Sequence, residues 1–98
     1  MTIQIDPEGN ESKRLQRLAD FQSARILEVG CGDGRLTWRY AGAAEHVTGV
    51  DMHDDNLRVA LLERPANLAQ SVRFARADAV HLPFRSDAFD LAIFSWSF

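Results

Sequence analysis

Three glycines and one aspartate stand at a spacing that points to ligand binding. Gly30, Gly32 and Gly34 alternate directly after an apolar run. A chain that turns sharply while a ligand lies against its backbone needs positions without Cβ, some of them with positive φ. Asp51 follows Gly30 by twenty-one residues, where a carboxylate is placed to accept two hydrogen bonds from a ribose diol. These residues therefore predict a pocket for a ligand that contains ribose.

Apolar runs and helical periodicity predict the elements that position these residues. Short apolar runs predict four strands, at residues 25–29, 46–50, 72–77 and 89–96. Apolar residues three and four apart predict three helices, at residues 10–20, 35–44 and 54–64. This alternation predicts an α/β fold with a parallel sheet. The link between the third and fourth strands is barely long enough for a crossover, so we expect an irregular or very short helical connection there.

Acidic residues fall at the ends of the first three predicted strands. Glu28 lies in the first strand just before the glycines, Asp51 ends the second, and Asp78 ends the third. Ligands of open α/β sheets bind beyond the carboxyl ends of the strands. We therefore expect the three carboxylates to converge on one edge of the sheet.

Two separate motifs resemble a known family. Residues 26–34, ILEVGCGDG, resemble the E/D-x-G-x-G-x-G signature of the class I S-adenosylmethionine-dependent methyltransferases. Residues 77–84, ADAVHLPF, together with the following Phe89-Asp90-Leu91, resemble the D-A-x-x-L-P-F … F-D pattern of one branch of that family. This branch contains the ubiquinone and menaquinone biosynthesis methyltransferases and the type 11 methyltransferase domain. The resemblance covers nearly the whole chain and implies a Rossmann-like sheet whose first four strands lie in the order 3-2-1-4.

The resemblance also implies S-adenosylmethionine as the cofactor. Its methionine end would be held by Glu28 and by the glycine turn, which comprises Gly30, Cys31, Gly32 and Gly34.

The remaining cofactor contacts implied by the resemblance come from later strand ends. Asp51 would take the ribose hydroxyls, with Met52 against the adenine face. Asp78 would accept a hydrogen bond from the adenine amino group, and the Ala79 amide would meet a ring nitrogen. Ser95 falls where the family lines the path to the sulfonium.

A dinucleotide site is an alternative for the glycine turn. That site has the pattern G-x-G-x-x-G, and Arg35 stands where its third glycine would fall. A pyrophosphate prefers a pocket rich in amides and poor in acids, whereas a sulfonium and an ammonium suit the carboxylates here. A nicotinamide-dependent oxidoreductase therefore remains a weaker alternative.

Some of these residues also have simpler interpretations. Asp78 alone would serve as a turn cap, and Met52 alone would be ordinary packing. Cys31 is expected to be a small residue in a tight turn rather than a nucleophile. The three histidines lack paired ligand spacing, so we predict no metal site.

Composition narrows the class of protein further. The net charge is −3 and no basic run occurs, so we expect no nucleic-acid partner. The apolar stretches are far shorter than the ~20 residues of a membrane helix, and the start of the chain lacks the pattern of a signal peptide. The single cysteine, Cys31, excludes an internal disulfide and favours a cytoplasmic location.

The chain length predicts one partial domain, with a helical lead-in over about residues 1–22 and a cofactor-binding half over residues 23–98. The family fold has seven strands, and we expect four here. The fourth strand would then be an exposed apolar edge, open to self-association or to a complementing C-terminal chain. We accordingly expect a chain that is marginally stable and inactive by itself.

The resemblance to this branch of the family implies methylation of a small molecule, with the acceptor and any catalytic base unassigned. A different class of function is a non-catalytic nucleoside-binding or interaction module that pairs through the fourth strand.

Overall fold

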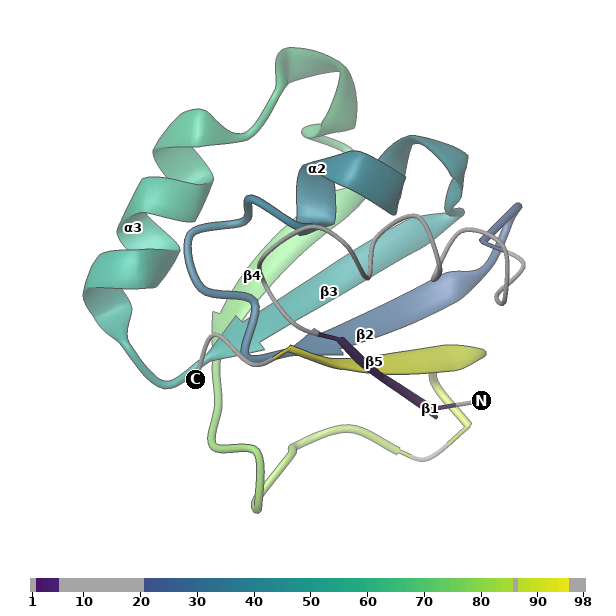
Figure 1. Ribbon diagram of the computed structural model, residues 1–98, viewed down its shortest axis with the longest axis vertical. Coiled ribbons are helices and arrows are strands. Elements are labelled where there is room, and N and C mark those ends of the chain that lie inside the picture. The colour runs from purple at the N-terminus through teal and green to yellow at the C-terminus, as the bar shows by residue number, and fades with distance from the viewer. Residues whose placement is uncertain (1, 6–20, 86, 96–98) are drawn as a thin grey trace.

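The computed structural model describes residues 2–5, 21–85 and 87–95. These residues form a parallel sheet with the strand order β1-β5-β2-β3-β4 (Figure 1). The strands are β1 (Thr2–Ile5), β2 (Arg25–Val29), β3 (His46–Asp51), β4 (Val72–Arg76) and β5 (Leu91–Ser95). The four predicted strands are β2 to β5, and their order confirms the predicted 3-2-1-4 arrangement.

The position of strand β1 contradicts the prediction that the fourth predicted strand, β5, is an exposed edge of the sheet. It pairs in parallel with β5, from Thr2 opposite Ala92 to Ile5 opposite Ser95. Because β5 therefore lies between β1 and β2, the prediction that it is an exposed edge is wrong. The sequence Thr-Ile-Gln-Ile does alternate polar and apolar residues, as strands do, but four residues give too short a pattern to separate a strand from a loop. The helix predicted at residues 10–20 lies outside the described residues.

The helices are α2 (Thr37–Tyr40), which continues as the 3-10 turn η1 (Ala41–Ala43), α3 (Asp54–Glu63) and the 3-10 turn η2 (Ala66–Leu68). The predicted helix at residues 35–44 is thus mostly a short helix and a 3-10 turn, and Gly42 within it disfavours longer helical structure. Helix α3 ends as predicted before Pro65, because the residue preceding a proline favours extended backbone. No helix in the described part of the chain is long and apolar enough to cross a membrane.

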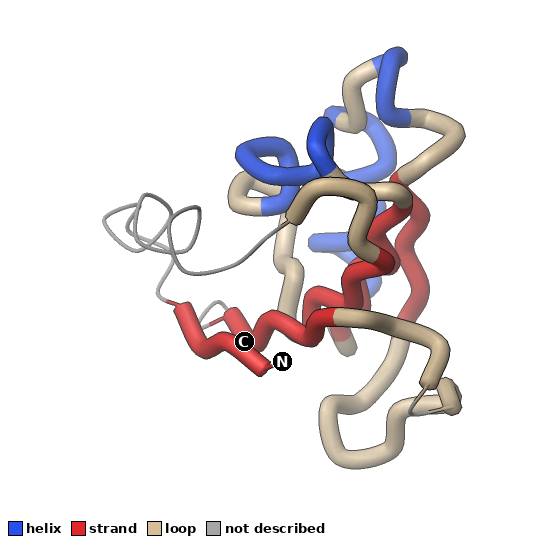
Figure 2. The backbone as a smooth tube through the Cα atoms, turned by 90° about the vertical axis from the view of Figure 1, so that its right-hand side faces the viewer, coloured by secondary structure: helices blue, strands red, loops and turns tan. Residues whose placement is uncertain are grey.

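The two faces of the sheet are covered differently. Helices gather on one side, and the loop that joins β4 to β5 runs along the other (Figure 2). The first face packs a core that includes Ile26, Tyr40, Val47 and Ile93. The second packs Leu27, Val29 and Val50 against loop residues that include Leu82, Phe84 and Phe89. The loop has no helix at residues 77–85 or 87–90, which confirms the predicted irregular connection.

An ion pair fixes the end of that loop to the centre of the sheet. The Asp90 carboxylate accepts hydrogen bonds from the backbone N–H of Arg25 at 2.9 Å and from its guanidinium at 2.9 and 3.2 Å. The Asp90 N–H donates in return to the Arg25 carbonyl at 2.7 Å. These bonds with Arg25 lower the pKa of Asp90 to about 2. The start of β5 is thereby held against the start of β2, and both strands reach the same edge of the sheet.

Candidate functional site

The glycine turn after β2 adopts the backbone that the sequence predicts. Gly30, Gly32 and Gly34 have φ values of 78°, 58° and 90°, a region that residues with a Cβ rarely occupy. The turn is tied to β3, because the N–H groups of Gly30 and Cys31 both donate to the Val50 carbonyl, at 2.8 and 3.0 Å. The turn is therefore a fixed surface at the carboxyl end of the sheet.

Asp51 joins the glycine turn to the end of β3. Its Oδ2 accepts a hydrogen bond from the Gly32 N–H at 2.9 Å, and its Oδ1 accepts one from the His53 N–H at 2.9 Å. The residue is only 2% exposed. Sequence reasoning placed Asp51 at this edge but did not foresee that it holds the turn in place.

Glu28 is fully buried beneath α2. Its Oε1 accepts hydrogen bonds from the Thr37 hydroxyl at 2.7 Å and the Tyr40 hydroxyl at 2.5 Å. Its Oε2 has no hydrogen-bond partner among the described residues. Burial raises the pKa of Glu28 to about 7, although both hydroxyls act to lower it. No sequence pattern indicated a role for Thr37 or Tyr40 beyond their place on the first crossover helix.

A pocket of about 150 Å³ opens at this edge of the sheet. It lies beside the glycine turn and is lined by Cys31, Gly32, Asp33, Arg35, Leu36, Asn56 and Ser95. Three of these, Cys31, Gly32 and Ser95, are sequence-predicted site residues. The other four were missed, although three of them lie within or just after the glycine motif and Asn56 lies in the first turn of the helix that follows Asp51.

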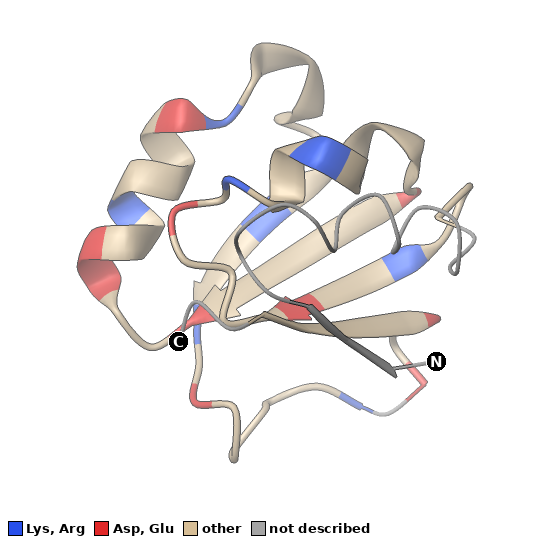
Figure 3. Ribbon diagram, viewed as in Figure 1, with Lys and Arg blue, Asp and Glu red and all other residues tan. Residues whose placement is uncertain are grey.

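Carboxylates lie around the pocket: Asp33 lines it, and Glu28 and Asp51 lie near the Cys31 thiol. The pKa of the Cys31 thiol is raised by burial first, and then by the charges of Glu28, Asp51 and Asp33. Figure 3 shows acidic positions at the arrow ends of the central strands and in the loop ahead of α2. A thiol held protonated in this way is a poor nucleophile, whereas a cation is stabilised by the same charges.

The residues predicted to contact adenine lie outside the pocket lining. Met52 is 51% exposed. The Asp78 carboxylate accepts a hydrogen bond from the Val80 N–H at 2.9 Å and lies 3.7 Å from the His81 ring. Asp78 thus caps a turn, as its simpler interpretation requires, and Ala79 is exposed within that turn.

Comparison with known proteins identifies the class. Residues 26–98 match the family model of the methyltransferase domain. The chain therefore belongs to this family, and the resemblance predicted from its two motifs is confirmed.

Individual relatives agree with this assignment. The O-methyltransferase rstn1 of Aspergillus nomiae is 33% identical over 91 residues, which are 91% of this chain and 40% of the relative. The demethylmenaquinone methyltransferase of Lactococcus lactis is 26% identical over 83 residues, 82% of this chain and 33% of the relative. The crystal structure of an S-adenosylmethionine-dependent methyltransferase from Mesorhizobium loti is 29% identical with a TM-score of 0.74, over 89% of this chain and 39% of that one. The chain thus spans less than half the length of each of these proteins.

Proposed function

We propose that this chain is the S-adenosylmethionine-binding part of a methyltransferase that acts on a small molecule. The observation that carries this proposal is the pocket beside the glycine turn, with three carboxylates in or near its wall. The sulfonium and ammonium of the cofactor are cationic and match the carboxylates of Glu28, Asp33 and Asp51. A pyrophosphate would be repelled by the same carboxylates, which disfavours the nicotinamide alternative.

The glycine turn fits the methionine end of this cofactor. Cys31 and Gly32 line the pocket without large side chains, and Gly30 and Gly34 flank them in the same turn, so a ligand approaches the main chain closely. Glu28 lies behind this turn with one buried oxygen, Oε2, still lacking a partner. An ammonium in this region would compensate that oxygen, since buried polar atoms are normally paired.

Asp51 is proposed to bind the ribose hydroxyls. Among the described residues, Oδ2 accepts a hydrogen bond from the Gly32 N–H and Oδ1 accepts one from the His53 N–H. A carboxylate oxygen accepts about two, so each oxygen has capacity for one hydroxyl.

The proposed adenine contacts are Met52, Asp78 and Ala79, which all lie at the surface of the chain. Among the described residues, the Oδ2 of Asp78 has only the His81 ring as an ion-pairing neighbour, at 3.7 Å. Its acceptor capacity is available for an adenine amino group.

In the proposed mechanism, this part of the protein orients the cofactor and excludes water from it. When bound, S-adenosylmethionine supplies a methyl group on a sulfonium, already activated for an in-line displacement. The glycine turn and Asp51 would bind and orient the cofactor. Leu36 and Ser95, which line the pocket, would keep water away from the bound sulfonium. No described residue is assigned as a catalytic base.

The small-molecule acceptor is supported by the relatives. The Lactococcus protein is named for demethylmenaquinone, and the Aspergillus protein is named as an O-methyltransferase. A cytoplasmic location completes the proposal, supported by the single cysteine, which is buried and free.

Calorimetric titration of the chain with S-adenosylhomocysteine tests the proposal. We expect saturable binding, and we expect Asp51→Ala to weaken it at least tenfold because the variant loses both the ribose acceptor and the anchor of Gly32. Asp55→Ala is the matched control, since Asp55 is an exposed aspartate that pairs only with Arg58 among the described residues.

Circular dichroism of each variant separates loss of binding from loss of fold. Failure of the folded wild-type chain to bind S-adenosylhomocysteine, or saturable binding of a nicotinamide dinucleotide instead, would overturn the proposal.

A further inference from the structure

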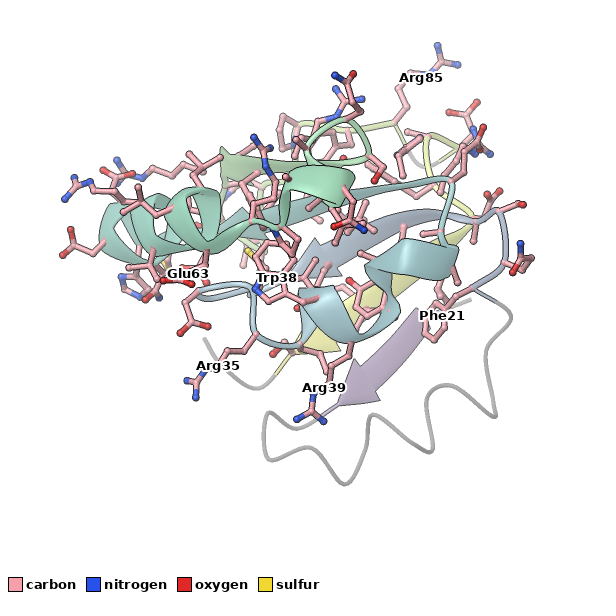
Figure 4. The ribbon with its side chains drawn as sticks, turned by 90° about the horizontal axis from the view of Figure 1, so that it is seen from above. Phe21, Arg35, Trp38, Arg39, Glu63 and Arg85 are labelled. Atoms are coloured by element: carbon pink, nitrogen blue, oxygen red, sulfur yellow. The ribbon has the colours of Figure 1, made fainter. Side chains whose placement is uncertain are left out.

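Arg35 stands at the pocket with unused hydrogen-bond donors. Its Nε lies 3.2 Å from Oδ2 of Asp33 and donates to Oδ1 at 3.3 Å. Its two terminal nitrogens have no hydrogen-bond partner in the described part of the chain. The side chain is 89% exposed and projects outward from the loop ahead of α2 (Figure 4).

The pairing with Asp33 orients this guanidinium. A carboxylate that engages Nε leaves the two terminal nitrogens as a planar fork, which is the geometry that binds a second carboxylate through two parallel hydrogen bonds.

Arg35 differs from the other residues of the pocket lining in its positive charge. It is the only cationic side chain among the described residues that line the pocket. The neighbouring charges, those of Asp33 and Asp51, are acidic and repel an anion. The amide of Asn56 also lines the pocket and makes no hydrogen bond to another described residue, so it adds a neutral donor. An anionic group on an otherwise cationic ligand therefore has one favourable place to bind.

We propose that Arg35 binds the α-carboxylate of the amino-acid end of the cofactor, and that Asp33 is the positioning residue that orients the guanidinium. The inference rests on the proposed function and assigns the recognition of one group of that ligand. It predicts that this chain discriminates between nucleoside ligands by their carboxylate.

The test compares two ligands by calorimetry on the full chain. S-adenosylhomocysteine contains the carboxylate, and its decarboxylated analogue keeps the nucleoside, the sulfur and the amine. We expect the wild-type chain to bind S-adenosylhomocysteine roughly 10- to 100-fold more tightly, the range for hydrogen bonds to a charged group. Arg35→Gln is expected to remove this preference by weakening only the binding of S-adenosylhomocysteine.

Two further variants complete the test. Asp33→Asn is expected to reduce the preference for S-adenosylhomocysteine over its decarboxylated analogue several-fold, beyond any loss of affinity that the two ligands share. Arg58→Gln is the matched control, because Arg58 is also exposed and paired with an aspartate but does not line the pocket.

The outcomes separate this inference from the function on which it rests. An Arg35→Gln chain that keeps the preference, or that loses affinity equally for both ligands, overturns the role of Arg35 and leaves the proposed function standing. A wild-type chain that binds neither ligand overturns both.

Discussion

Glu28 is a carboxylate removed from water on a central strand. Two hydroxyls engage Oε1, and Oε2 has no partner among the described residues. Burial disfavours the charged form, so the pKa rises from its usual 4.5 to about 7. Near neutral pH the group is therefore close to half protonated, and a bound cation would shift it toward the charged form.

This pKa predicts how stability depends on pH. Between pH 4.5 and 7 the folded chain binds more protons at Glu28 than the unfolded chain does, so its stability falls as the pH rises and is then constant above about pH 7. The contribution of Glu28 to this fall is about 3 kcal/mol. Glu28→Gln is expected to flatten the dependence, measured by urea unfolding from pH 5 to pH 8.

Glu63→Gln is the control for that measurement. It removes a carboxylate from the exposed end of α3 without touching the buried network. An unchanged slope in Glu28→Gln, or an equal change in both variants, would show that Glu28 does not govern the dependence.

Sequence reasoning succeeded for residues whose role follows from the backbone. The positive φ of the glycines and the place of Asp51 at the strand end are dictated by motif and spacing. The hydrogen bonds that Thr37 and Tyr40 donate to Glu28 were not predictable, because they depend on how α2 lies over the sheet. The exposure of Asp78 likewise depends on the path of the irregular loop, and that of Met52 on the short turn between β3 and α3.

At the scale of elements, the junction between the glycine turn and α2 is tightly packed. A Cβ on Gly34 would lie 2.5 Å from Cζ2 of Trp38, whose ring packs edge-on against Phe74 at 5.8 Å between centroids. Gly34 also has a φ of 90°. The place of α2 on the sheet thus depends on the absence of a side chain at Gly34.

Gly34→Ala is expected to destabilise the chain by about 1–3 kcal/mol, through backbone strain and displacement of the Trp38 ring. Gly42→Ala is its matched control, since a Cβ there meets nothing within 4 Å. That variant is expected to be neutral or more stable by about 0.4–1 kcal/mol. Thermal unfolding of both variants checks the contrast, and equal melting temperatures would refute it.

The strands were more predictable than the helices for a physical reason. Strands β2 and β3 are buried on both faces, so their sequences lack the strict polar–apolar alternation of a half-exposed strand. The segment at residues 35–44 has helical periodicity, but its glycine and the constraint of the preceding turn shorten the helix to α2. Periodicity describes which face is buried, not how long the hydrogen-bonded helix is.

At the scale of the whole molecule, the two sides of the sheet differ in what opposes pairing with another chain. Strand β4 bears exposed Arg73 and Arg76, and the Arg64 guanidinium donates a hydrogen bond to the Val72 carbonyl at 2.8 Å. Charged side chains on an edge strand oppose pairing with another chain. On the opposite side, β1 pairs with the apolar strand β5 and so removes β5 from the edge of the sheet.

Strand β1 therefore predicts the association state of the chain. Removal of residues 1–5 would leave the backbone N–H and C=O groups of Leu91–Ser95 unpaired on one side, and apolar edges of this kind pair with other chains. We expect the shortened chain to self-associate as its concentration rises, whereas the full chain, as the control, stays monomeric. Sedimentation velocity over a concentration series measures this. Equal sedimentation of both chains at every concentration would mean that β1 does not prevent β5 from pairing with another chain. Only the β4 side, with its arginines, would then be protected.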